Sequence, residues 1–240
     1  MRSGLFLGLL ILGRIIPLSI LGGSQSDLSN MPDWPILFNE NFDSRTLQGW
    51  EMTDTNAWEI VSDNGNRVLS LFQASEYEPP FRSPLNIALM HNVCVADFVL
   101  EAKIKSTSRE YGHRDMCFIF GWQDPSHFYY AHIASKADPH ANSIFLVDGA
   151  PRVSIANMRT DGTQWINDRY HTVRILRKSG DGTIEVYFDD MAHPIMSAVD
   201  TTFLKGYVGF GSFDDTGNVD DIQIWSPDQE CSADLSPVFD

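Results

Sequence analysis

The chain has 240 residues, of which 43% are hydrophobic and 12% aromatic, and its formal net charge is −15. This length supports one sizeable hydrophobic core, and the aromatic content excludes a disordered chain. A strongly acidic chain offers little of the basic surface that nucleic acids and anionic lipids require, so we expect neither as a partner. The composition predicts a soluble globular protein whose ligand is neutral or cationic.

The first 26 residues, 1–26, have the pattern of a secretory signal peptide. Arg2 precedes two apolar runs that lead to the small residues at 22–24. Arg14 and Pro17 interrupt the apolar sequence before it reaches the roughly 18 residues that a membrane anchor needs. We therefore expect a secreted, periplasmic or cell-surface protein that is not inserted in the membrane after signal cleavage.

Short runs of alternating hydrophobic and polar residues fill the chain from residue 34 to 226. The run 98–104 is one example and 184–188 another, and turn sequences such as Asn64-Gly65 separate the runs. No window shows a convincing helical period. The pattern predicts one all-β domain at 34–226, a sandwich or a jelly roll, followed by an acidic tail at 227–240.

Both ends of this domain carry a distinctive pattern. The opening segment reads WPILFNENFDSRTLQGWEMTDTNAWEIVSDNGNRVLSL, and the closing segments read GTIEVYFDD and GYVGFGSFDDTGNVDDIQIW. Together they resemble the concanavalin A-like lectin/glucanase jelly rolls. Within that group the chain is similar to laminin-G-like modules, family 16 glycoside hydrolases and the bacterial 3-keto-disaccharide hydrolase domains. The resemblance implies a concanavalin A-like jelly-roll β-sandwich of two antiparallel sheets, and function has to be argued from a site.

The catalytic motif of the family 16 hydrolases is missing. That motif places acidic residues at alternate positions of one strand, which brings an acid and a nucleophile onto the same face. No strand here contains it. The sequence therefore favours a non-catalytic, carbohydrate-binding module. A glycan-active hydrolase or lyase and a structural laminin-G-like adhesion module are the alternatives.

The segment 111–140 is the densest in polar and aromatic side chains and contains four of the seven histidines. In the strand predicted at 128–134, Tyr129 shares its parity with core residues, so Tyr130 and His132 are predicted to face the open side of the sheet. Aromatic rings pack against the C–H faces of sugars while polar neighbours bind the hydroxyls. The candidate ligand-binding residues are Arg114, Asp115, Trp122, His127, Tyr130, His132, Asp138, His140 and Trp165.

Two other chemistries fit the same segment. If the site is catalytic, His132 and Asp138 are the candidate groups, with His132 as the base. His127, His132, Asp138 and His140 also have the side chains of a metal site, although their spacing is irregular.

Two acidic residues near the ends of the domain are predicted to face inward. Glu40 shares the parity of Phe38, and Asp220 shares that of Ile222. A buried carboxylate needs a cation or hydrogen-bond donors. The resemblance to family 16 implies a structural Ca²⁺ at the positions of Glu40 and Asp220, and hydrogen-bonded carboxylates are the alternative.

The three cysteines, Cys94, Cys117 and Cys231, allow at most one disulfide within the chain. A Cys94–Cys117 bond is one option, and buried free thiols are the other.

Overall fold

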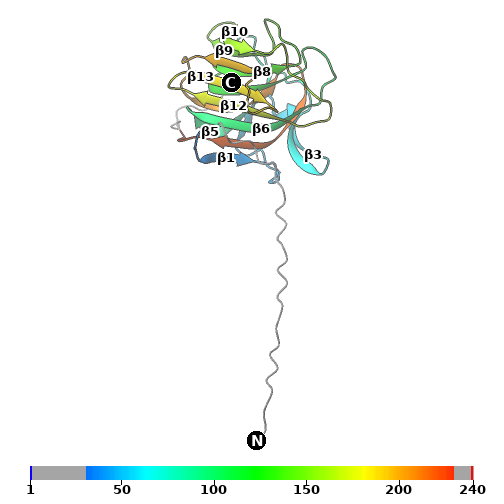
Figure 1. Ribbon diagram of the computed structural model, residues 1–240. Helices are drawn as coiled ribbons and strands as arrows, with labels where there is room; N and C mark the ends of the chain where they lie inside the picture. The colour runs from blue at the N-terminus through cyan, green and yellow to red at the C-terminus, as the bar shows by residue number, and fades with distance from the viewer. Residues whose placement is uncertain (2–30, 230–238, 240) are drawn as a thin grey trace.

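The computed structural model describes Met1, residues 31–229 and Phe239. These residues form two antiparallel β-sheets that pack face to face, so the predicted all-β sandwich is confirmed (Figure 1). One short 3₁₀ turn, η1 (Thr55–Ala57), is the only helical segment among them. None of the described residues belongs to a helix that is long and apolar enough to span a membrane. The predicted signal peptide, apart from Met1, lies outside this range.

The nine-stranded sheet has the order β11-β14-β13-β12-β6-β16-β4-β3, and β1 also pairs with β16. Figure 1 shows three of its central strands, β6, β12 and β13, side by side. Its members are β1 (Ile36–Glu40), β3 (Trp58–Asp63), β4 (Asn66–Leu71), β6 (Phe98–Ser106), β11 (Ala156–Arg159), β12 (His171–Lys178), β13 (Thr183–Phe188), β14 (Met196–Val199) and β16 (Gly217–Trp225).

The seven-stranded sheet has the order β10-β9-β8-β7-β15-β5-β2. Its members are β2 (Trp50–Met52), β5 (Asn86–Val95), β7 (Asp115–Asp124), β8 (His127–Ala134), β9 (Ser143–Asp148), β10 (Val153–Ser154) and β15 (Gly206–Ser212). Successive side chains along each strand point to opposite faces of the sheet, so each sheet can contribute one face to the shared core.

The alternation in β8 is the one predicted. Tyr129, Ala131 and Ile133 belong to the core between the sheets. Tyr130 and His132 point to the outer face of the seven-stranded sheet, but that face is not open, because Tyr130 is 0% and His132 only 4% exposed. The prediction of an open face was therefore wrong.

A second hydrophobic cluster covers this outer face. Tyr130 packs there with residues of β5, β7 and β9, and Phe213 joins the cluster from the segment after β15. Phe81, from the connection before β5, and Phe239 pack against the same cluster. Connections between strands thus bury side chains that strand parity alone leaves exposed.

The cysteines differ in their chemical state. Cys94 is disulfide-bonded, whereas Cys117 is a buried free thiol. The Cys94–Cys117 bond considered from the sequence is therefore excluded. Cys231 lies outside the described residues.

Glycines allow β15 to lie close to both of its neighbours in the seven-stranded sheet. A Cβ atom added to Gly209 would lie 2.2 Å from the carbonyl oxygen of Ala88 on β5. A Cβ atom on Gly206 would lie 2.3 Å from the backbone carbon of Gly121 on β7. Both contacts are with backbone atoms, which cannot move away as the end of a flexible side chain can.

We predict that Gly209→Ala lowers the melting temperature by about 4–8 °C, because relieving the clash costs on the order of 2 kcal/mol in a chain of this size. Thermal unfolding followed by circular dichroism measures this change. Gly180→Ala is the matched control, since a Cβ atom there meets nothing within 4 Å. Equal melting temperatures for the two variants would contradict the prediction.

Candidate ligand-binding site

A pocket of about 330 Å³ opens on the outer face of the seven-stranded sheet. Asp115 reaches it from the start of β7, His132 from β8 and Phe213 from the segment after β15. The remaining lining residues come from connections between strands. The full lining is Arg82, Tyr111, His113, Asp115, His132, His140, Arg152, Phe213 and Asp214.

A buried pair, Asp115 and His132, forms the floor of the pocket. Nε2 of His132 lies 2.8 Å from Oδ2 of Asp115, and Nδ1 lies 3.1 Å from the carbonyl oxygen of His140. The His132 ring is thus held at both nitrogens, by the carboxyl group of Asp115 and by the carbonyl oxygen of His140.

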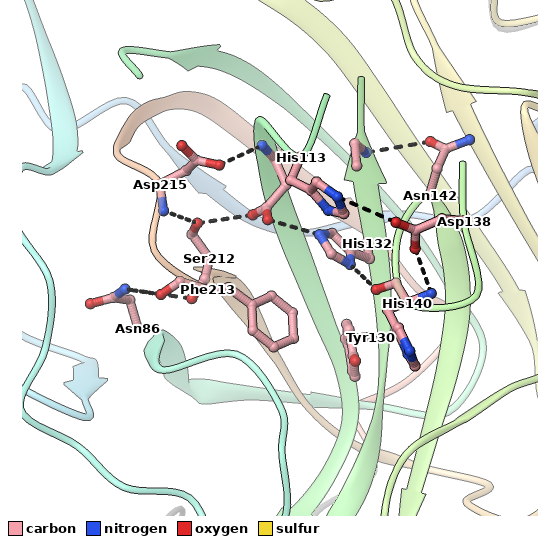
Figure 2. Close-up of polar contacts among 12 residues, drawn as sticks. Asn86, His113, Tyr130, His132, Asp138, His140, Asn142, Ser212, Phe213 and Asp215 are labelled. Atoms are coloured by element: carbon pink, nitrogen blue, oxygen red, sulfur yellow. Dashed lines mark hydrogen bonds and ion pairs between the residues drawn. The ribbon is translucent and has the colours of Figure 1, made fainter. Parts of the chain in front are cut away.

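A second layer of polar groups holds Asp115 in place. The hydroxyl of Ser212 donates to Oδ1 of Asp115 at 2.9 Å, and the backbone N–H of Asp215 donates to that hydroxyl oxygen at 3.1 Å. Oδ2 of Asp215 accepts from the Tyr111 hydroxyl at 2.7 Å and from the backbone N–H of Asp115 at 2.9 Å. Figure 2 shows Ser212, Asp215 and His132 linked in this way. Burial raises the pKa of the Asp215 carboxyl above its ordinary value.

Arg152 forms one wall of the pocket. Its guanidinium lies 4.6 Å from the centre of the Phe213 ring and 4.9 Å from that of Phe145. Nη1 donates to the Tyr130 hydroxyl at 2.7 Å, and Nη2 donates to the carbonyl oxygen of His140 at 3.1 Å. These contacts fix the plane of the guanidinium. Burial raises the pKa of Tyr130, so its hydroxyl stays protonated.

Cationic and polar groups surround the mouth of the pocket. Arg82 is exposed and has no hydrogen bond or ion pair with other described residues. His113 lies 3.4 Å from the carboxylate of Asp138, and that carboxylate also accepts the backbone N–H of His140 at 2.6 Å. The pocket therefore offers hydrogen-bond donors at its rim, above the hydrogen-bonded pair of Asp115 and His132.

Three of the predicted ligand residues, Asp115, His132 and His140, do line the pocket. Tyr130 lies beneath it and contributes only its hydroxyl, through Arg152. Asp138 lies beside the rim, where it positions His113 and His140.

Four other candidates, Trp122, Arg114, His127 and Trp165, lie away from the pocket. Trp122 is 0% exposed and packs against Phe128 and Phe239, so it presents no face to a sugar. Arg114 is buried and donates to Ser106 and to the side chain of Asn167.

His127 pairs with Asp124 at the opposite end of β8 from His132, about 16 Å along the strand. The predicted metal set of His127, His132, Asp138 and His140 therefore does not come together. Trp165 is 8% exposed, borders a separate hollow beside Tyr111, and packs on Phe188 of the nine-stranded sheet.

The two acids predicted to bind calcium lie on the paired strands β1 and β16, but their side chains face opposite sides of the sheet. Glu40 pairs in register with Ile222 and accepts the backbone N–H of Phe42 at 2.6 Å. Asp220 lies at a β-bulge, and its partner on β6 is Lys103 rather than a core residue. Val219 takes the core position instead. The predicted inward orientation of Asp220 was thus wrong, because the bulge turns it to the outer face.

Asp220 is nevertheless buried, with 4% of its surface exposed. Its Oδ2 accepts from the amide of Asn66 at 2.6 Å, whereas Oδ1 has no hydrogen-bond partner among the described residues. Burial raises the pKa of this carboxyl to about 6.

No protein-family model and no curated protein matches the chain. Solved structures do. The carbohydrate-binding module CBM66 from Bacillus subtilis superposes with a TM-score of 0.53 at 16% identity, over 74% of this chain and 96% of that module. The fold is a jelly-roll β-sandwich of the concanavalin A-like type.

Two further structures have the same fold. A protein of unknown function with a galectin-like fold, also from Bacillus subtilis, gives a TM-score of 0.52 at 14% identity, over 80% of this chain and 96% of its own. Domain 4 of AbnA, an extracellular arabinanase of Geobacillus stearothermophilus, was solved in complex with arabinotriose. It gives a TM-score of 0.50 at 11% identity, over 80% of this chain and 93% of that domain. At these identities the matches establish the fold and nothing finer.

Sequence reasoning missed the six other residues of the lining: Arg82, Tyr111, His113, Arg152, Phe213 and Asp214. Each lies in a connection between strands, so strand parity carries no information on its direction. Tyr111 and His113 belong to the segment 111–140, whereas nothing in the sequence distinguishes the other four from the same residue types elsewhere in the chain.

We predict that Asp220 makes stability fall as the pH rises, when chelator keeps divalent cations away. The pKa of its carboxyl is about 6 in the folded chain and about 3.9 when unfolded, so the folded state binds more protons between these values. The contribution is full below pH 4 and is lost as the pH passes 6. Asp220→Asn should therefore match the wild-type melting temperature at pH 4 and exceed it at pH 7. A difference that does not change with pH would contradict this.

Proposed function

We propose that the protein binds a carbohydrate in the pocket above Asp115 and His132, outside the cytosol and without chemical turnover. The single observation that carries the proposal is the pocket itself, where the Phe213 ring, the fixed guanidinium of Arg152 and the free guanidinium of Arg82 line the same space. Sugars bind where an aromatic face meets a few convergent polar groups. The pocket volume of about 330 Å³ suits one or two sugar rings.

The fold supports this choice of ligand. One structure with the same fold is described as a carbohydrate-binding module, and another was solved with arabinotriose bound. The fold alone hosts unrelated functions, so the proposal depends on the pocket and not on these likenesses.

Two observations favour binding without turnover. A general base needs a free lone pair, and both nitrogens of His132 face acceptors. The carboxylate of Asp138 is engaged by His113 and by the N–H of His140. The candidate catalytic groups therefore have structural partners already.

Export is supported by the disulfide at Cys94. Disulfides persist in oxidising compartments and are rare in the cytosol. Together with the signal-peptide pattern of residues 1–26, the bond favours a secreted, periplasmic or cell-surface location.

A structural Ca²⁺ at Asp220 is part of the proposal. The buried Oδ1 of Asp220 lacks a partner, and a carboxylate oxygen is a ligand that Ca²⁺ prefers. Glu40, the other predicted ligand, lies on the neighbouring strand and is held by the N–H of Phe42 through Oε1. Glu40 shares the face of the core residue Ile222 whereas Asp220 lies on the outer face, so of the two predicted acids only Asp220 would hold the cation, which would hold β16 against the start of β4. This role is stabilising and not catalytic.

We predict that Arg82→Ala and Arg152→Ala each weaken sugar binding by about 10–100-fold, because each removes hydrogen bonds from a charged donor. A glycan array identifies the ligand, and calorimetry with that glycan measures the loss. Arg67→Ala is the matched control, since Arg67 lies on β4 of the other sheet. Unchanged affinity in both pocket variants would place the sugar elsewhere.

The same glycan, incubated with the protein, should yield no new reducing ends and no unsaturated products. Product formation would favour a hydrolase or lyase instead. Failure of every glycan to bind would favour a structural adhesion module.

We predict that Ca²⁺ raises the melting temperature of the wild-type protein at pH 7 and that EDTA reverses the rise, because a ligand that binds only the folded state stabilises it. Asp220→Asn should remove the response. Asp221→Asn, a change at the adjacent exposed residue, should retain it. A wild-type melting temperature that is indifferent to both Ca²⁺ and EDTA would exclude the site.

A further inference from the structure

Three side chains with metal-ligand atoms gather at the floor of the pocket. Asp115 and Cys117 are two residues apart on β7 and so project from the same face. His132 lies directly opposite Cys117 on β8. One potential ligand atom from each residue lies within 4.8 Å of the other two, and all three residues are buried. Among the described residues this is the only such group.

Neighbouring groups orient two of these side chains as they would in a metal site. Nδ1 of His132 faces the carbonyl oxygen of His140, which directs Nε2 into the cluster. The Ser212 hydroxyl binds Oδ1 of Asp115 and leaves Oδ2 directed toward His132. Histidines that bind metals almost always donate their other N–H to a carbonyl or carboxylate, and ligating carboxylates are themselves hydrogen-bonded.

The third side chain, Cys117, is the polar group that the rest of the structure leaves unexplained. It is 0% exposed, it is a free thiol, and within the described part of the chain it makes no hydrogen bond. Its sulfur nevertheless points into a cluster with a carboxylate and an imidazole, in a face that is otherwise largely aromatic.

We propose that Asp115, Cys117 and His132 bind Zn²⁺, with a fourth coordination position that opens into the pocket. A set of one oxygen, one sulfur and one nitrogen suits Zn²⁺, whereas a thiolate disfavours Ca²⁺ and Mg²⁺. Asp115 and His132 line the pocket, so water or a ligand oxygen can reach the open position. The same pocket provides the path by which the metal enters.

The ligand set also suits the charge of the ion. To bind Zn²⁺, Cys117 would supply a thiolate, Asp115 a carboxylate and His132 a neutral imidazole. Zn²⁺ with these three groups carries no net charge, so the buried cluster would hold the ion without an uncompensated charge in low-dielectric surroundings.

The experiment uses the untagged full chain without any sugar, so its outcome is independent of the proposed carbohydrate binding. Co²⁺ is added as a spectroscopic substitute for Zn²⁺. We expect about one Co²⁺ per chain and a cobalt–thiolate charge-transfer band in the near ultraviolet, since Cys94 is disulfide-bonded. Zn²⁺ should bleach the band, raise the melting temperature and release protons, measured by calorimetry in buffers of different ionisation enthalpy.

Variants assign the band to the cluster. Cys117→Ala should abolish it and His132→Gln should weaken Co²⁺ binding at least tenfold, while His127→Gln, at the other end of β8, should leave it unchanged. Circular dichroism establishes that each variant is folded. If Cys117→Ala does not fold, the wild-type spectrum and His132→Gln still decide the matter. A wild-type chain without the band, or a band that persists in folded Cys117→Ala, would overturn the proposal.

Discussion

The buried contact between Asp115 and His132 governs the outer face of the seven-stranded sheet. A buried polar pair in an apolar layer is tolerated only when its remaining lone pairs and protons have partners. Here Ser212 and the carbonyl of His140 supply them, and Asp215 in turn holds Ser212. Each of these partners comes from a different connection or strand end. The pair therefore fixes the segments that form the pocket, and those segments in turn shield the pair from solvent.

Sequence periodicity predicted the strands and their faces because each strand buries one face in the common core. In β8 it separated Tyr129, which lies in the core, from Tyr130, which lies on the outer face. It could not predict that Tyr130 is buried, because the covering residues, Phe81 and Phe213, lie in connections distant in sequence. Trp122 was misjudged for the same reason, since its cover includes Phe239.

The error at Asp220 has a different physical origin. A bulge inserts one residue between Asp220 and Gln223, so residues on either side of it change faces. Asp221 accommodates the bulge with a positive φ of 46°, a conformation that Asp tolerates better than most residues. Two successive aspartates fit such a bulge, yet they also fit an uninterrupted strand end. The alternation of faces therefore predicts side-chain orientations as far as Val219, and it has to be counted anew for the residues after the bulge.

The charge of the pocket does not follow the charge of the chain. The whole sequence carries −15, yet the pocket is lined by Arg82 and Arg152, and the carboxyl group of Asp115 at its floor is hydrogen-bonded to His132. Asp214 is the remaining acidic group in the lining. Donors thus outnumber free acceptors at the point where a ligand enters. The composition pointed to a neutral or cationic ligand, but the pocket selects by its own donors, which suit the hydroxyl oxygens of a sugar whatever the charge on the distant surface.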